Sequence, residues 1–212
     1  MNNEEVLSQL CESHPQLAGI KDAIHEAVRV ITKSYSTGGK LLVCGNGGSC
    51  SDSDHIVGEL MKSFEQKRPI GDGLKDRLFA IGDDRGLYIA NKLQQGLPAI
   101  SLTAQSALIT AIGNDIDSDL IFAQQVTVYG NSGDVLIGIS TSGNSRNVID
   151  ALISAKAKGM ITIGLTGKTG GEMKPFCDVL IRVPGQLTAE VQELHLPVYH
   201  AICRMVENHF FG

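Results

Sequence analysis

Five short apolar runs constrain the fold of this chain more than any other feature of its sequence. Their residues are almost continuously apolar rather than alternately apolar and polar, a pattern typical of strands that are buried on both faces of a parallel sheet. The runs cover residues 41–45, 99–103, 134–140, 161–166 and 178–183. Segments with helical character separate several of them, notably 51–64, 145–158 and 188–210. This alternation predicts a doubly wound α/β domain, in which ligands bind at the carboxyl ends of the strands.

The rest of the chain is predicted to form further helices and one long insertion. Residues 2–36 carry apolar side chains at helical spacing, and Pro15 is expected to divide them into two helices. The insertion covers residues 65–98, between the first two strands, and should contain a helix over about residues 84–95. Because the chain has 212 residues and no internal repeat, we expect a single domain over 1–212.

The composition argues against several classes of protein. The net charge is −5, with acidic and basic residues interspersed, so neither a nucleic acid nor an anionic membrane is an expected partner. The longest apolar runs, of about six residues, are too short to span a bilayer, and the acidic N-terminus does not resemble a signal peptide. Five scattered cysteines without a C-x-x-C pair suit reduced thiols. We therefore expect a cytoplasmic protein.

Two of the predicted strands end in turns that could bind a phosphate group or a sugar. They read GNGGSCS (45–51) and STSGNS (140–145), and each precedes a predicted helix. Glycine lets a ligand approach the backbone closely, and the N–H groups at a helix N-terminus favour an anion. Neither turn contains lysine or arginine, so a phosphomonoester or a set of sugar hydroxyls suits them. The alternative is that both are ordinary strand-to-helix turns.

Nucleotide-binding motifs are incomplete in this sequence. GNGGSC has Cys50 where a dinucleotide-binding turn needs its third glycine, and TIGLTGKT has Thr162 where a P-loop begins with glycine. ATP and NAD are therefore not expected ligands. Cys50 lies near a predicted helix N-terminus, which would favour a thiolate, so thiol chemistry is a further alternative to a simple packing role.

His55 and Glu59 lie four residues apart in the helix that is predicted to follow the first turn. This spacing puts both side chains on one face of the helix, near the edge of the sheet where ligands bind. A histidine and a carboxylate so placed could be metal ligands or an acid/base pair. The alternative is a pair of surface residues on a helix.

The last predicted helix carries Gln192, His195 and His200 among apolar residues. Gln192 and His200 are about 80° apart when viewed down the helix axis, so they can face the same side while His195 points elsewhere. Pro197 should bend the helix between them, since it removes one backbone hydrogen bond. The alternative is that these are polar residues at the edge of the core.

Six segments, in this order, resemble the phosphoheptose isomerases, which are enzymes of the sugar isomerase (SIS) fold. The segments read CGNGGS, HIVGEL, ITAIGND, GISTSGNS, LTGKTGG and VQELHLPVYH. The resemblance covers about residues 20–210, except most of the insertion. It implies an SIS-type five-stranded parallel sheet between helices, and a homotetramer with sites at subunit interfaces. It also implies cytoplasmic conversion of sedoheptulose 7-phosphate to D-glycero-D-manno-heptose 7-phosphate, for activated-heptose biosynthesis.

The resemblance also implies which residues of this chain form the site. Contacts with the phosphorylated sugar would come from Asn46, Gly47, Gly48, Ser49, Glu59, Asn114, Asp115, Ser140, Thr141, Ser142, Ser145 and Gln192. One zinc ion per subunit would be held by His55, Glu59, Gln192 and His200. The isomerisation needs a base that moves a proton between C1 and C2 through an enediol, and an acid for the oxygens, which we assign to Glu59 and His200. Zinc could polarise the carbonyl or be structural.

The sequence also departs from this family, which keeps rival functions open. The insertion at 65–98 is longer than is typical, and Ser63 and Ala189 stand where members often carry arginine and aspartate. One rival is a non-catalytic SIS module that binds a sugar phosphate in regulation or assembly. The presence of all four predicted zinc ligands argues against it. A second rival is an isomerase of another phosphosugar, which would use the same chemistry.

Overall fold

The five predicted strands are present in the computed structural model, which describes residues 2–212. They form one parallel sheet in the order β2-β1-β3-β4-β5. The strands are β1 (Leu41–Gly45), β2 (Ala99–Ser101), β3 (Val135–Ser140), β4 (Ile161–Thr166) and β5 (Val179–Arg182). The expected doubly wound α/β class is confirmed. Strand β2 is two residues shorter than predicted, and β5 ends before Val183.

Helices account for most of the remaining chain. The α-helices are α1 (Asn3–Ser13), α2 (Lys21–Ser36), α3 (Gly48–Met61), α4 (Asp72–Lys92), α5 (Ser106–Asp115), α6 (Ala123–Tyr129), α7 (Arg146–Ala157) and α8 (Thr188–Phe211). Three short 3₁₀ turns are η1 (Pro15–Ile20), η2 (Ser118–Leu120) and η3 (Lys174–Phe176). Pro15 separates α1 from η1 and α2, as predicted. Among the helices of residues 2–212, none has the length and hydropathy needed to cross a bilayer.

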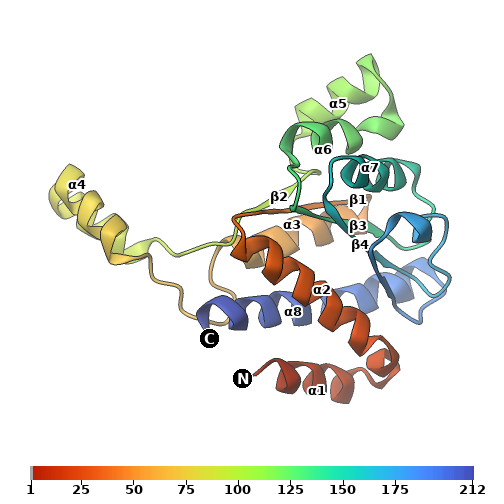
Figure 1. The fold of residues 1–212 in the computed structure, drawn as a ribbon, viewed down its shortest axis with the longest axis horizontal. Coiled ribbons are helices and arrows are strands. Elements are labelled where there is room, and N and C mark those ends of the chain that lie inside the picture. Colours follow the sequence, from red (N-terminus) through yellow and green to blue (C-terminus); the bar gives the residue numbers. More distant parts are fainter. Residues whose placement is uncertain (1) are drawn as a thin grey trace.

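The sheet has a separate apolar core on each face. Because side chains alternate along a strand, Leu41 and Val43 of β1 enter one core, and Leu42 and Cys44 enter the other. Helices α2, α3 and α8 cover the first face, with α1 packed against α8, whereas α6 and α7 cover the second (Figure 1). Both faces are therefore buried, which explains why the strands lack polar alternation.

The insertion differs from its prediction. Helix α4 begins at Asp72, well before the predicted start near residue 84, and ends at Lys92. Asp83 has a φ of 42°, a left-handed conformation that is uncommon outside glycine, and it breaks α4 into two short helices. The two pack closely, with Gly86 against the backbone of Leu78, where any Cβ would clash. This hairpin extends away from the sheet (Figure 1). Glycine is a poor helix former, so Gly73 and Gly82 weaken the helical pattern of the first half of α4, and the sequence did not predict it.

The two ends of the insertion lie side by side. The backbone N–H of Gln95 donates to the carbonyl oxygen of Arg68 at 2.7 Å, and Pro69 and Gln94 form an isolated antiparallel bridge. The Gln94 side chain accepts a hydrogen bond from the backbone N–H of Ser63 at 2.9 Å. The chain therefore leaves the domain and returns to it at nearly one place.

Candidate active site

Two strand ends meet at the point where the sheet order reverses. The chain runs outward from β1 to β2 in one direction and from β3 to β5 in the other, so the turns after β1 and β3 are neighbours at the switch point of the sheet. The side-chain amides of Asn46, in the first turn, and Asn147, at the start of α7 just after the second turn, exchange two hydrogen bonds of 2.8 and 2.9 Å. The two turns that the sequence singled out therefore lie together at the edge where such sheets bind ligands.

The first turn leads directly into α3. Gly47 has a φ of 57° and is exposed, as are Asn46 and Gly48. Gly48 is the first residue of α3, and a Cβ on it would collide with the Gln192 side-chain amide. Ser49 is buried and lies against Gly45 beneath the turn. Exposed backbone at the N-terminus of a 14-residue helix suits an anion.

The second turn is held in shape by its own hydroxyl groups. The Ser140 hydroxyl accepts the backbone N–H of Gly143 at 3.1 Å and lies 2.9 Å from the Ser145 hydroxyl. Thr141 is half-buried and Ser142 is exposed. Gly143 has a φ of 72°, and its carbonyl oxygen accepts the backbone N–H of Met173 at 2.9 Å. The segment 167–173 thus supports this turn from one side.

His55, Glu59 and His200 form one cluster between α3 and α8. The His55 Nε2 atom lies 3.1 Å from a carboxylate oxygen of Glu59 and 3.5 Å from the His200 Nε2 atom. The Glu59 side chain is 12% exposed, and Lys62 donates to its other oxygen at 3.3 Å. Burial, together with the neighbouring His55, lowers the pKa of His200. The expected pairing of His55 with Glu59 on one helix face is confirmed, and α8 brings His200 to it.

The cluster continues behind His55 to two residues that the sequence did not single out. The hydroxyl of Tyr199 lies 3.0 Å from the His55 Nδ1 atom and donates to a carboxylate oxygen of Asp52 at 3.3 Å. Asp52 precedes His55 by three residues, so the two share a helix face, and Tyr199 is adjacent to His200. That spacing is the only signal in the sequence that could have identified them.

Gln192 and the pair Asn114–Asp115 lie apart from this cluster. Gln192 lies two turns before His200 on α8, against the first residue of α3. No hydrogen bond within residues 2–212 joins it to His55, Glu59 or His200. Asn114 and Asp115 end helix α5, where both are exposed and hydrogen-bonded to each other at 2.7 Å. Helix α5 packs against η2 and lies far from α8 (Figure 1). A single chain therefore does not bring Asn114 and Asp115 to the cluster.

The cluster contains the kinds of donor atom that zinc binds, namely imidazole nitrogens and a carboxylate. Its side chains are not arranged around a single point. Within residues 2–212, no three His, Cys, Asp or Glu side chains converge on one point as a metal site. The three side chains form a row centred on His55. Two ligands on a tetrahedral zinc ion, each about 2.1 Å away, are about 3.4 Å apart. The facing nitrogens of His55 and His200 are 3.5 Å apart, and Glu59 adds a carboxylate beside them.

His195 points away from the cluster, as predicted, and is fully buried. Neither ring nitrogen makes a hydrogen bond of good geometry within residues 2–212. Burial lowers the pKa of His195 to about 4, and the nearby Thr166 backbone opposes this shift only weakly. An unfolded histidine has a pKa of about 6.5, so the unfolded chain binds this proton more readily. The stability that depends on a neutral His195 is therefore complete above pH 6.5 and is lost as the pH falls toward 4.

We expect His195→Leu to flatten the pH dependence of stability between pH 6.5 and 4. Over this window the wild type should lose, through this residue alone, on the order of 2 kcal/mol of unfolding free energy that the variant keeps. Urea unfolding of both proteins at pH 7 and pH 4.5 measures the difference. Parallel losses in the two proteins would contradict the prediction.

Comparison with known proteins supports the family suggested by the site. The SIS domain model matches residues 8–75 and 85–167. The chain is 39% identical over 207 residues to a phosphoheptose isomerase of Maridesulfovibrio salexigens, covering 98% of this chain and 85% of that protein. It is 43% identical over 179 residues to one of Burkholderia pseudomallei, covering 84% and 78%.

Solved structures agree with these sequence relatives. The phosphoheptose isomerase from Francisella tularensis superposes with a TM-score of 0.76 at 30% identity, covering 98% of this chain and 100% of that one. The Neisseria gonorrhoeae enzyme gives a TM-score of 0.74 at 33% identity, covering 97% and 98%. The likeness thus extends over the whole fold, and the chain belongs to the SIS-domain family of phosphoheptose isomerases.

Proposed function

We propose that this protein converts sedoheptulose 7-phosphate to D-glycero-D-manno-heptose 7-phosphate for activated-heptose biosynthesis. The observation that carries the proposal is the cluster of Glu59, His55 and His200 beside two turns suited to a phosphorylated sugar. Relatives that are 39% and 43% identical over most of the chain are phosphoheptose isomerases, which supports the same reaction here.

The turns would bind the phosphate and the sugar hydroxyls. The N-terminus of α3 offers exposed backbone at Gly47 and Gly48, and its partial positive charge favours a phosphate. Ser142 is exposed, and Thr141 and Ser145 are partly exposed, so their hydroxyls can donate to phosphate or sugar oxygens. These donors carry no charge, so they would bind the phosphate dianion without help from a lysine or arginine in the turns.

Glu59 and His200 would move the protons. As base, the Glu59 carboxylate takes a proton from C1, the C1–C2 double bond forms, and His200 gives a proton to the C2 oxygen. In the second half, the C2 carbon takes a proton back from Glu59, while the C1 hydroxyl gives its proton to His200 and becomes the aldehyde. The lowered pKa of His200 keeps its imidazole neutral at pH 7, so it serves as a neutral hydrogen-bond donor.

We also propose that His55, Glu59, Gln192 and His200 hold one zinc ion per subunit. The 3.5 Å separation of the two imidazole nitrogens supports a shared cation. Zinc would polarise the substrate carbonyl and stabilise the negative charge of the enediolate. Gln192 lies against Gly48 at the start of α3, where it could bind either metal or sugar.

A homotetramer in the cytoplasm is the assembly that we propose. Asn114 and Asp115 lie away from the cluster in one chain, so a neighbouring subunit would have to supply them or complete the site around them. Helix α4 exposes large apolar side chains on its hairpin, which suits burial against another subunit. They are Leu74, Phe79, Ile81, Leu87 and Tyr88.

Turnover in deuterium oxide tests the proposed reaction. Zinc-reconstituted protein is incubated with sedoheptulose 7-phosphate, and NMR follows the aldose product and the deuterium at its C2. We expect turnover with solvent deuterium at C2, because a base that exchanges with water carries the proton. Turnover of another ketose phosphate alone would identify a different phosphosugar isomerase. Binding without turnover across a panel of ketose phosphates would leave a sensor or assembly module.

A further inference from the structure

We propose that Arg68 is a positioning residue for the isomerisation, which fixes the last turn of α3, and with it Glu59, against α8. The kinetic consequence rests on the proposed function, whereas the fixed position of the helix end does not. Arg68 follows the end of α3 at Met61, at the base of the hairpin, and its side chain is completely buried.

The Arg68 guanidinium closes the end of α3. The last carbonyl groups of a helix have no partner within it. Arg68 donates from Nη1 to the carbonyl oxygen of Leu60 at 2.8 Å and from Nη2 to that of Glu59 at 3.3 Å. The backbone N–H of Leu97, at the other end of the insertion, also donates to the Leu60 carbonyl oxygen at 2.9 Å. Both ends of the insertion therefore hold the last turn of α3.

The same guanidinium is fixed to α8. Its Nε–H donates to a carboxylate oxygen of Glu207 at 2.8 Å, and its Nη2 atom also lies 2.8 Å from that oxygen. The carboxylate accepts the backbone N–H groups of Phe64 and Glu65 as well, at 2.9 Å each. Glu207 lies about two turns after His200, so both side chains project from nearly the same face of α8. Arg68 therefore connects the end of α3 to the face of α8 that carries His200.

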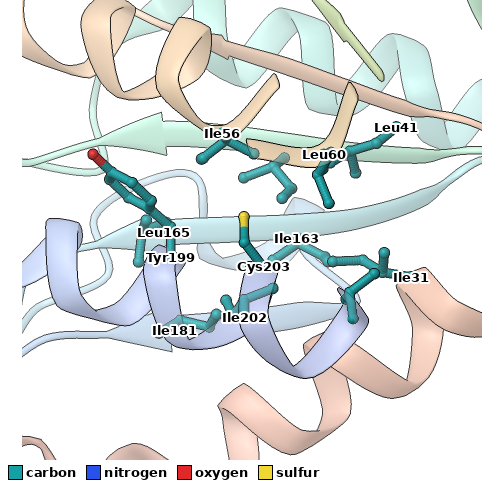
Figure 2. A pocket seen from close by; sticks show the side chains of 12 residues that line it. Ile31, Leu41, Ile56, Leu60, Ile163, Leu165, Ile181, Tyr199, Ile202 and Cys203 are labelled. Carbon is teal, nitrogen blue, oxygen red and sulfur yellow. The ribbon is translucent and has the colours of Figure 1, made fainter. Parts of the chain in front are cut away.

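Apolar packing between α3 and α8 would not fix this register by itself, because the hydrophobic effect has no direction. Figure 2 shows Ile56 and Leu60 of α3 and Cys203 of α8 directed into one apolar pocket. Hydrogen bonds from a planar guanidinium, in contrast, specify both distance and angle. The guanidinium carbon lies 4.7 Å from the centre of the Phe211 ring, which holds the plane from one side.

The register matters because Glu59 belongs to both parts of this arrangement. Its backbone carbonyl contacts Arg68, and its carboxylate lies 3.1 Å from the His55 Nε2 atom. A rotation or displacement of the last turn would therefore move the proposed base away from its place in the cluster. A misplacement of about 1 Å can cost about 10²-fold in rate. The turns proposed to bind the phosphate lie at the other end of α3, so substrate affinity should change little.

Arg68→Lys is the decisive variant, because it keeps a cation for Glu207 but lacks the planar group that reaches both carbonyl oxygens. Arg68→Met combined with Glu207→Met is the second variant, since it removes the guanidinium and leaves neither charge alone. Val126→Ala is the matched control, because it weakens the core on the opposite face of the sheet. The readouts are kcat and KM for sedoheptulose 7-phosphate at a temperature where each protein is fully folded, and amide hydrogen exchange of residues 57–61.

We expect kcat to fall about 10-fold to 100-fold in both Arg68 variants, with little change in KM and with faster exchange at residues 57–61. Val126→Ala should keep the wild-type kcat and the wild-type exchange at these residues, although its unfolding midpoint falls. The double variant decides alone if Arg68→Lys does not fold.

Wild-type kcat or wild-type exchange at the end of α3 in either folded Arg68 variant would overturn the inference. An equal loss of kcat in Val126→Ala would also overturn it, because the loss would then follow stability alone. A wild type that turns over no sugar phosphate would overturn the proposed function instead, because the exchange measurement needs no substrate.

Discussion

Replacing Glu59 by glutamine is expected to lower kcat for sedoheptulose 7-phosphate by about 10²-fold to 10⁴-fold, the range that a general base contributes. The amide keeps the volume of the side chain and can still contact His55, but it cannot accept a proton from C1. The measurement is steady-state kinetics together with exchange of the C1 proton of the substrate into deuterium oxide. Both rates should fall together, because both depend on the same proton transfer.

Glu193→Gln is the matched control for this variant, since it makes the same chemical change at an exposed position of α8. It should behave as the wild type. His200→Ala should also lose turnover while the fold persists. A Glu59→Gln variant that keeps its kcat, or that loses turnover but still exchanges the C1 proton, would show that another group is the base.

Breaking the buried ion pair of Arg68 with Glu207 should have the largest effect on stability. Both side chains are almost completely buried, and the Arg68 Nε–H donates to the carboxylate at 2.8 Å. Burial disfavours a charged Glu207. The backbone N–H groups of Glu65 and Phe64, together with Arg68, outweigh burial and lower the pKa of Glu207. Arg68→Met would leave this carboxylate buried without its cation, which costs about 3–5 kcal/mol.

Urea unfolding of Arg68→Met measures this cost. The control is Lys75→Met, which breaks an exposed ion pair with Asp72 and should change the unfolding free energy by less than about 1 kcal/mol. The double variant Arg68→Met with Glu207→Met should recover much of the loss, because neither charge is then left alone. Equal stabilities of Arg68→Met and Lys75→Met would show that the buried pair contributes little.

The same arginine connects stability to the candidate active site. Its guanidinium donates to the carbonyl oxygens of Leu60 at 2.8 Å and Glu59 at 3.3 Å, at the end of α3. These carbonyls lie in the last turn of a helix and have no partner within it. Arg68 therefore joins the end of the helix that carries Glu59 to the helix that carries His200.

Much of this fold could be predicted from the sequence because the strands are buried on both faces. Strands β1 and β4 coincide with the apolar runs 41–45 and 161–166. Their residues are almost all buried, so each strand begins and ends where the apolar run does. The pairing of His55 with Glu59 was also predictable, because helical spacing alone places them together. The approach of His200 was suggested by the resemblance, and the packing of α8 on α3 brings it about.

Other parts of the structure depend on contacts between residues far apart in the chain. Arg68 and Glu207 are separated by 139 residues, so nothing local marks them as partners. The start of α4 was missed because its glycines weaken the helical pattern and because its apolar side chains do not face the core. Tyr199 has an apolar ring in a helix that faces the core, and only the fold shows where its hydroxyl lies.

The adjoining ends of the insertion have a consequence for how this protein can evolve. The SIS domain model leaves a gap between residues 75 and 85, within the hairpin that projects from the domain. Hydrogen bonds at Ser63, Arg68 and Gln95 hold the two ends of the insertion together where the chain leaves and re-enters the domain. The hairpin beyond them can therefore vary without changing the rest of the domain. The hairpin can change in length and sequence during evolution while Arg68 still holds the end of α3. New subunit contacts can thus arise without any change to the cluster of His55, Glu59 and His200.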